Sequence, residues 1–239
     1  MLNLRVPSYL VTMNTCNCEG CELKSLFFEY VSNSEIEAIC TRKTERTFIK
    51  GDIIIQEGDE IKDFMYLKKG LVKLYRKGAN DKEQIICFAL PFDFVSLLSI
   101  FSEKNHKYSV AALEDSTTCI INLDEVKNIA IHNGKFVMNL MEKTSRVADM
   151  IILDFLDVKE KRLFGRIAYI LLYFADKVFH KDSFDLPVSR KEMAEYIGMT
   201  IENVIRTLSD MRKDGIIKIY GSTIEIVDKE RLQRINELS

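Results

Sequence analysis

The sequence lacks the segments that would place it in a membrane. Its 239 residues contain no apolar run long enough for a transmembrane helix, which needs about 18 or more such residues. Residues 1–11 lack the charged start and the long apolar centre of a signal peptide. With 47% hydrophobic residues, the chain can form one large or two ordinary domain cores. We therefore expect a cytoplasmic protein with no membrane partner.

The sequence also lacks the signatures of common catalytic sites. It contains no Walker, Rossmann or G-x-S-x-G glycine pattern. Its Asp and Glu residues show no spacing that singles out an acid–base pair. His106, His132 and His180 are scattered, and no neighbouring residues complete a zinc or catalytic set. The sequence does not indicate an enzyme.

Residues 189–208 have the pattern of a helix-turn-helix. Ser189 and Glu192 have the S-x-x-E spacing of a capping box, which starts a first helix. Gly198 permits a tight turn, and Thr200 can cap a second helix. This arrangement makes DNA the first partner to consider.

The second helix of this motif predicts one buried face and one exposed face. Glu202, Asn203 and Arg206 lie on the exposed side near its start, and these residue types recognise base edges in the major groove. The opposite face carries the apolar residues at i, i+4 and i+7, namely Val204, Leu208 and Met211. Residues 216–220 and 223–227 then alternate around Gly221 as two strands. The whole segment is typical of a winged helix-turn-helix.

Positive charge is scarce for a nucleic-acid-binding protein. The formal net charge is −2, and residues 187–221 carry six Lys/Arg against five Asp/Glu. Because phosphate contacts by Lys and Arg supply most nonspecific affinity, DNA binding must depend on a local arrangement of side chains.

Residues 48–123 are rich in short strands separated by glycine turns. Gly-Asp turns at 51–52 and 58–59 flank one strand, and further strands are predicted at 64–67, 71–75, 84–89, 108–113 and 117–121. Many short strands with regular turns indicate a sandwich or barrel.

From about residue 135 the apolar period changes from two to about 3.5. A stripe with this period is either a core helix or a dimer seam, and its place between a β domain and a helix-turn-helix favours the seam. A two-fold homodimer would place two recognition helices about 34 Å apart, which implies an inverted-repeat operator on double-stranded DNA. The predicted seam consists of Val137, Leu140, Met141, Thr144, Val147, Ile151, Phe155 and Val158.

The order of these segments resembles the CRP/FNR family of bacterial transcription regulators. The likeness covers residues 18–227, and the Gly-Asp turns, the motif at 66–75, the long helix and the winged helix-turn-helix carry it. It implies an α+β fold with an amino-terminal β-roll of the cyclic-nucleotide-binding jelly-roll type. The implied domains are a cysteine-containing segment (1–24), a β-roll sensor (25–134), a central dimerisation helix (135–158) and a winged helix-turn-helix DNA-binding domain (159–239).

The resemblance also implies residue roles. In the family, a glutamate and an arginine four residues later contact bases, and Glu202 and Arg206 stand at those positions, with Ile205 between them as a variable specificity position. The implied function is sequence-specific transcription regulation, including activation through contact with RNA polymerase. The candidate DNA-binding residues are Ser189, Arg190, Thr200, Glu202, Asn203, Ile205 and Arg206.

The family's cyclic nucleotide site does not match this chain. Leu97 replaces the glutamate that binds ribose, and His106 or Lys107 would have to replace the arginine that clamps the cyclic phosphate. The resemblance therefore argues against a cyclic nucleotide as the effector.

Six cysteines in a cytoplasmic chain argue against disulfides. The oxygen-sensing branch of the family holds a [4Fe–4S] cluster by three amino-terminal cysteines and one in a roll strand. Here Cys16, Cys18, Cys21 and Cys119 are the candidate ligands, with Cys16 substituting for a family position that is Phe27 in this chain. The resemblance implies that the cluster favours the DNA-binding dimer, and that oxygen or nitric oxide dismantles it.

Other interpretations of the cysteines stay open. The same thiolates suit a tetrahedral zinc site, and clustered thiols can form a redox switch. Alternatively the chain binds no metal, Cys119 is a buried small residue, and the β-roll binds an unknown small ligand. Cys40 and Cys87 lie in apolar surroundings and are expected in the core.

Overall fold

The computed structural model describes residues 30–32, 35–36, 39, 43–78, 82–93, 95–96 and 98–238. The chain forms two compact units, one of residues 1–76 and 87–149 and the other of residues 77–86 and 150–239. Among the described residues, no helix is long and apolar enough to cross a membrane.

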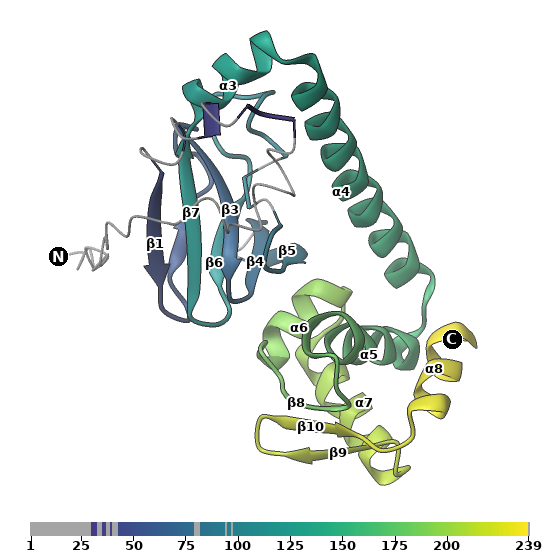
Figure 1. Cartoon of the computed structure of the whole chain (residues 1–239). Coiled ribbons are helices and arrows are strands. Elements are labelled where there is room, and N and C mark those ends of the chain that lie inside the picture. Colours follow the sequence, from purple (N-terminus) through teal and green to yellow (C-terminus); the bar gives the residue numbers. More distant parts are fainter. Residues whose placement is uncertain are drawn as a thin grey trace, which may run out of the picture. The chain divides into compact units, whose positions relative to one another are not determined.

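Two antiparallel sheets build the β-roll (Figure 1). One sheet has the strand order β1-β7-β3, and the other has the order β2-β6-β4-β5. Their strands are β1 (Thr44–Phe48), β2 (Ile53–Ile55), β3 (Asp63–Lys69), β4 (Val72–Lys77), β5 (Glu83–Ala89), β6 (Ser109–Ala112) and β7 (Ser116–Asn122).

Strands β2 to β7 confirm the predicted strand-rich region, because each predicted strand overlaps an observed one. Strand β1 was not predicted. Its sequence, Thr-Glu-Arg-Thr-Phe, is polar at four of five positions, so it lacks the apolar alternation of a half-buried strand. Pairing with β7 nevertheless buries Glu45 opposite Cys119.

Two helices follow the roll. Helix α3 (Leu123–His132) begins at Asn122, whose side chain accepts a hydrogen bond from the amide of Asp124. The long helix α4 (Gly134–Glu160) begins beside Asn133, whose Oδ1 accepts from the amide of Phe136 at 3.0 Å. Asn side chains that accept from the first helical amides are ordinary start signals. The caps at Asn122 and Asn133 thus define where α3 and α4 begin, and no proline stands between the two helices.

The start of α4 packs into the core of the roll. Phe136 and Leu140 belong to one buried cluster with Cys119 and Ile121 of β7 and Phe64 of β3. Burial of such side chains contributes about 1.5–3 kcal/mol each relative to exposure. This cluster fixes the first turns of α4 against the sheet.

Helix α4 ends without a helix-breaking residue. Residues 135–164 contain neither proline nor glycine, yet the helix stops at Glu160 and α5 (Leu163–Leu172) starts after an extended Arg162. A π-helical turn, η3 (Tyr173–Phe179), continues α5. At the break between α4 and α5, the side chain of Arg166 bonds the carbonyls of Lys159 and Lys161.

The second unit is a winged helix-turn-helix. Helix α6 (Arg190–Ile197), helix α7 (Ile201–Lys213) and the hairpin of β9 (Ile217–Tyr220) and β10 (Thr223–Ile226) confirm the predicted motif. Strand β8 (Ser183–Asp185), which pairs with β10, and the helix α8 (Lys229–Leu238) were not predicted. Strand β8 has only three residues, too few to show an alternating pattern, and it forms a strand because it pairs with β10.

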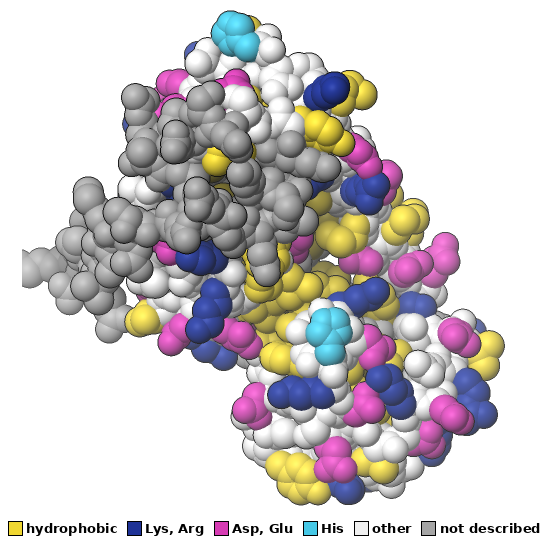
Figure 2. All heavy atoms as spheres, viewed as in Figure 1, with side chains coloured by type: hydrophobic (Ala, Val, Ile, Leu, Met, Phe, Trp, Pro, Cys, Tyr) yellow, Lys and Arg dark blue, Asp and Glu magenta, His cyan; other side chains and the backbone are white. Residues whose placement is uncertain are grey.

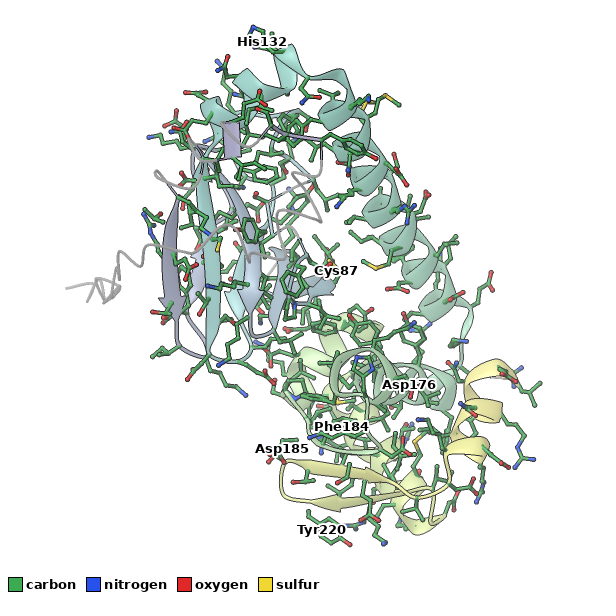
Figure 3. All side chains as sticks on the ribbon, viewed as in Figure 1. Cys87, His132, Asp176, Phe184, Asp185 and Tyr220 are labelled. Atoms are coloured by element: carbon green, nitrogen blue, oxygen red, sulfur yellow. The ribbon has the colours of Figure 1, made fainter. Side chains whose placement is uncertain are left out.

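An aromatic group anchors β8 to the helices. Phe184 points into the unit (Figure 3) and is 2% exposed. Its ring stacks on Phe179 at 5.3 Å between centroids and lies 6.4 Å from that of Phe174. Such pairs add to the energy of area burial alone. They hold the three-stranded sheet β8-β10-β9 in place beside the helices of the unit.

Gly70, in the turn between β3 and β4, should not tolerate a side chain. Its φ is +100°, and a Cβ there would lie 2.7 Å from Ser116 Cα and 2.8 Å from the Asp115 carbonyl oxygen. Gly70→Ala should therefore lower the free energy of unfolding by about 2–4 kcal/mol through backbone strain and overpacking. The control is Gly51→Ala, since Gly51 has a φ of +93° and open space around it. Denaturant unfolding should give a clearly smaller loss for the control, and equal losses would contradict the steric argument.

Candidate DNA-binding interface and sensor region

The capping box predicted for the first helix of the motif is present. Ser189 Oγ accepts from the Glu192 amide at 3.1 Å, and Glu192 Oε2 accepts from the Ser189 amide at 2.8 Å. Gly198 ends α6 in the left-handed conformation at a φ of +64°, which glycine adopts without a steric cost. Thr200 Oγ1 then caps α7 by accepting from the Asn203 amide at 3.2 Å. These bonds fix the turn between the two helices.

Helix α7 divides into faces as the sequence indicates. Val204, Leu208 and Met211 are buried, and so is Thr207, which the apolar pattern missed because its residue type is polar. The exposed face near the helix start carries Glu202, Ile205 and Arg206, with Asn203 half-buried beside them. The fold thus brings the predicted base-reading side chains together on one surface.

Two of these side chains contact each other before any DNA is bound. Arg206 Nη2 donates to Asn203 Oδ1 at 2.9 Å, a spacing typical of neighbours on one helix face. The backbone amide of Glu202 itself, followed by the Thr200 side chain, lowers the pKa of the Glu202 carboxyl. The start of α7 therefore presents one ionised carboxylate and one guanidinium as separate recognition groups.

Ser189 is exposed and Arg190 is not, and both side chains already have contacts within α6. The hydroxyl of Ser189 is engaged in the capping box, where it also donates to Glu192 Oε2 at 2.9 Å. Arg190 is half-buried, its Nη1 lies 3.7 Å from Met193 Sδ, and burial lowers the pKa of its guanidinium. DNA contact by these two residues remains a prediction.

The wing adds a surface residue that sequence reasoning missed. Tyr220 ends β9 beside the Gly221 turn, is 60% exposed, and extends from the edge of the unit (Figure 3). The alternation of the strand was visible in the sequence, but which face met solvent was not. Lys218 of the same strand pairs with Glu225 of β10 at 3.2 Å.

In the sensor unit, Cys119 lies in a row of neighbouring residues across the sheet, Glu45, Cys119 and Tyr66, which we call the polar row. Across the sheet, Cys119 of β7 pairs with Glu45 of β1 on one side and Tyr66 of β3 on the other. Its Sγ is fully buried and donates to Glu45 Oε1 at 3.6 Å. The same carboxylate oxygen lies 2.8 Å from Lys68 Nζ and 3.7 Å from Lys43 Nζ.

This environment sets the protonation of the thiol. Burial raises the pKa of Cys119 to about 11, although a hydrogen bond from Tyr66 and the nearby ammonium groups lower it in part. Glu45 keeps its charge, because the bond and charge of Lys68 outweigh desolvation and lower the pKa of its carboxyl. Cys119 is therefore a protonated thiol beside an ionised carboxylate.

The other predicted cluster ligands, Cys16, Cys18 and Cys21, lie outside the described residues, as does Cys40. Within the described part of the chain, no group of three or more His, Cys, Asp and Glu residues could hold a metal ion. Cys87 is buried in β5, as expected for a core residue.

The surface of α4 differs from the predicted seam. Leu140 and Val158 are each 8% exposed, and Val147 packs against the buried cluster that contains Leu140. Met141 and Phe155 are exposed, at 59% and 65%. The remaining predicted seam residues, Val137, Thr144 and Ile151, are half-buried. Because α4 is apolar on two faces, its period alone mixed the inward face with the outward one.

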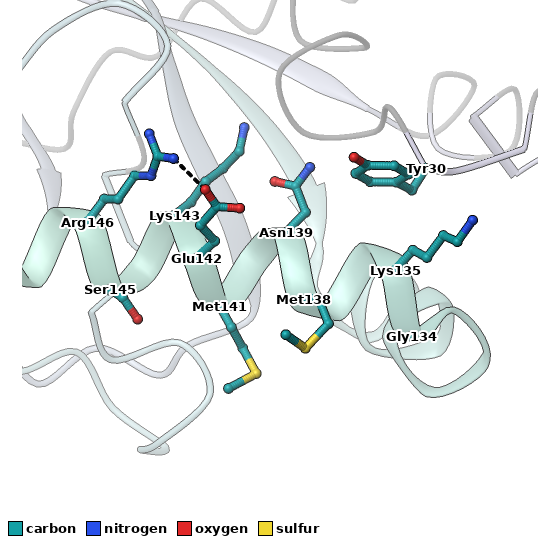
Figure 4. Close-up of a pocket in the computed structure, with 10 residues that line it drawn as sticks. All are labelled: Tyr30, Gly134, Lys135, Met138, Asn139, Met141, Glu142, Lys143, Ser145 and Arg146. Carbon is teal, nitrogen blue, oxygen red and sulfur yellow. Dashed lines mark hydrogen bonds and ion pairs between the residues drawn. The ribbon is translucent and has the colours of Figure 1, made fainter.

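The exposed apolar residues of α4 form their own stripe. Hydrophobic side chains emerge along the edge of the view where α4 runs (Figure 2). Met138 and Met141 point the same way as Ser145, away from Asn139 (Figure 4). With alternating spacings of three and four, this stripe consists of the exposed Met138, Met141, Ser145, Ile152 and Phe155 and the half-buried Ala148. This heptad spacing is typical of a coiled-coil seam.

An open surface pocket of about 1070 Å³ lies beside the first half of α4. Its lining is mixed, with an ion pair between Arg146 and Glu142 drawn in Figure 4. It is lined by Tyr30, Gly134, Lys135, Met138, Asn139, Met141, Glu142, Lys143, Ser145 and Arg146.

Two known domain families match this chain, one in the β-roll and one in the winged helix-turn-helix. Residues 45–133 match the cyclic nucleotide-binding domain, and residues 165–235 match the Crp-like helix-turn-helix domain. A β-roll of this type, a long helix and a winged helix-turn-helix define a DNA-binding transcription regulator. The chain belongs to the CRP/FNR family of transcription regulators. Membership in this family implies DNA binding and dimerisation.

Relatives extend over nearly the whole chain. The regulatory protein HlyX of Actinobacillus pleuropneumoniae is 29% identical, covering 90% of this chain and 92% of its own. The fumarate and nitrate reduction regulatory protein of Escherichia coli K12 is 27% identical, covering 92% of this chain and 90% of its own. The structure of FixK2 from Bradyrhizobium japonicum shares the fold, with a TM-score of 0.73 at 23% identity, covering 82% of this chain and 98% of its own. Relatives and neighbours alike are regulators rather than enzymes.

Arg206 should determine specificity at one base pair of the operator. Arg206→Ala should cost about 1–3 kcal/mol at the cognate pair, because a bidentate guanine contact is lost. Arg212→Ala, in the last turn of the same helix, is the control for loss of charge. Binding of each variant to operator and to single mismatches, measured by fluorescence anisotropy, checks this. Unchanged discrimination in Arg206→Ala would exclude the role.

Proposed function

We propose that this chain is a homodimeric regulator that responds to oxygen, redox state or nitric oxide through a [4Fe–4S] cluster held by Cys16, Cys18, Cys21 and Cys119. The observation that carries the proposal is the position of Cys119. It lies in the same buried cluster as Phe136, so chemistry at this sulfur acts on the start of the long helix. The similarity to fumarate and nitrate reduction regulatory proteins supports the same function.

The surroundings of Cys119 suit a thiolate ligand to iron. A soft sulfur donor in a dry core is the ligand type that iron–sulfur clusters use. Binding requires loss of the thiol proton, and Glu45 lies at hydrogen-bond distance to accept it. Lys43 and Lys68 then supply positive charge beside the new thiolate. When bound, the cluster would provide a redox-sensitive cross-link between this strand and the amino-terminal cysteines.

Coupling to DNA follows from packing. Cys119, Phe136 and Leu140 share one close-packed cluster, and such interiors respond to volume changes of a single methylene. A shift at Cys119 therefore changes how the first turns of α4 sit on the sheet, and with them the outward stripe. Dimerisation through that stripe would present two α7 helices to an inverted-repeat operator. Contact with RNA polymerase is part of the same proposal.

The cyclic phosphate site of the family is not supported by these residues. Lys107 Nζ is paired with Glu103 Oε1 at 2.6 Å on the surface. His106 is 7% exposed, its backbone bonds to Asp59 and Gly58, and burial lowers the pKa of its ring. A neutral imidazole and an occupied ammonium cannot replace a bidentate guanidinium clamp. The effector is therefore proposed to act at the cysteines.

Anaerobic purification should give a brown protein with about four irons per chain, the content of one cubane cluster. Cys119→Ser should lose most of this iron, the visible absorption and anaerobic operator binding, because one thiolate ligand is removed. Cys87→Ser is the matched control, since Cys87 is also buried but lies in β5. Iron analysis and absorption spectra check the expectation.

Three outcomes would contradict it. A colourless, iron-free anaerobic preparation would exclude the cluster, and about one equivalent of zinc would indicate a structural metal site. Unchanged operator binding by Cys119→Ser would favour a small ligand in the roll instead.

A further inference from the structure

Arg166 of α5 connects the ends of two helices. Its Nε donates to the Lys161 carbonyl at 2.8 Å, and its Nη2 donates to that of Lys159 at 3.2 Å. Its Nη1 donates to the carbonyls of Ile197 at 3.0 Å and Gly198 at 3.2 Å. All five residues belong to the second unit. One guanidinium thus bonds the last carbonyls of α4 and those at the turn of the helix-turn-helix.

The electrostatics of these positions favour a cation. The last carbonyls of a helix have no partner within the helix and carry partial negative charge. Arg166 meets two such ends at once, those of α4 and α6. Its rigid fork of donors can satisfy both, which a lysine ammonium at the end of a flexible stem cannot do in the same geometry.

A second polar link joins the same elements. Asp154 of α4 accepts a hydrogen bond from the Tyr169 hydroxyl of α5, and Tyr196 of α6 donates to the Tyr169 oxygen. Burial and the adjacent carboxylate raise the pKa of Tyr169 well above its usual range, so the phenol stays protonated as the donor. All three side chains are half-buried. The link runs parallel to that of Arg166, from α4 through α5 to α6.

We propose that Arg166 is a positioning residue that sets the angle of the helix-turn-helix relative to the end of α4, supported by the Asp154–Tyr169–Tyr196 link. The inference rests on DNA binding by a dimer, which family membership implies, and not on the cluster. In a dimer joined through α4, this angle sets the separation and tilt of the two α7 helices. Arg166 therefore determines which spacing between operator half-sites the dimer accepts.

The test is a spacing series with the anaerobically purified full chain. An inverted repeat selected from a random library is lengthened and shortened by single base pairs between its half-sites, and a DNA with one half-site is included. For Arg166→Met, the ratio of affinities for the optimal and altered spacings should fall about tenfold, a typical size for coupling between elements. Affinity for the single half-site should stay within about twofold of the parent, since α7 keeps its own contacts.

The control is Arg162→Met, which removes the same charge at an exposed position that makes no capping bond. It should keep the parental spacing ratio. Arg166→Lys should lie between the parent and Arg166→Met, because it keeps the cation and loses the fork. A folded Arg166→Met dimer with the parental spacing ratio would overturn the proposal.

Tyr169→Phe makes the test independent of folding defects. It removes one hydroxyl and leaves the apolar packing, so its thermal melting should be close to that of the parent. We expect a loss of spacing selectivity of about threefold, from one hydrogen bond. If Arg166→Met does not fold, parental selectivity in both Tyr169→Phe and Arg166→Lys would equally reject the positioning role. Loss of half-site binding in step with full-site binding would also reject it.

Discussion

The packing of Phe136 and Leu140 against the sheet that carries Cys119 is the contact on which the rest of the structure depends. It buries the inward face of α4 at its start and leaves the outward face to solvent. Because a helix is rigid over this length, fixing one face fixes the other. The exposed methionines of α4 are therefore positioned by a core on the opposite face of the helix. Under the proposed function, an effector at Cys119 would act on the dimer surface through the same constraint.

The polar row at Cys119 introduces a cost into an otherwise apolar core. A buried carboxylate is tolerated only when it is paired and hydrogen-bonded, and Glu45 has Lys68, Lys43 and the thiol around it. Such a row is stable while the thiol keeps its proton. If the proton moves to Glu45, the thiolate that is left lies near the ammonium groups of Lys43 and Lys68, whose positive charge stabilises it.

At the other end of α4, the structure depends on hydrogen bonds in addition to the burial of Val158. The carbonyls of Lys159 and Lys161 would be left without partners by the break in the helix, and Arg166 satisfies them. The same side chain then bonds the carbonyls at the turn of the helix-turn-helix. The end of α4 and the turn of the helix-turn-helix are therefore oriented relative to each other, since both bond the same planar guanidinium.

Local sequence pattern was enough to predict many elements of this fold. The capping box at Ser189, the turn at Gly198 and the buried face of α7 were predictable because each is decided within four residues of the chain. The order of roll, long helix and winged helix-turn-helix likewise determined the family. Tertiary structure alone decided which face of α4 is outward, that polar β1 is a strand, and that α4 ends where Arg166 reaches its carbonyls. The first two features depend on partners distant in sequence, and a helix apolar on two faces has the same period whichever face is buried. The end of α4 depends on a nearer side chain, but its carbonyl contacts leave no pattern in the sequence.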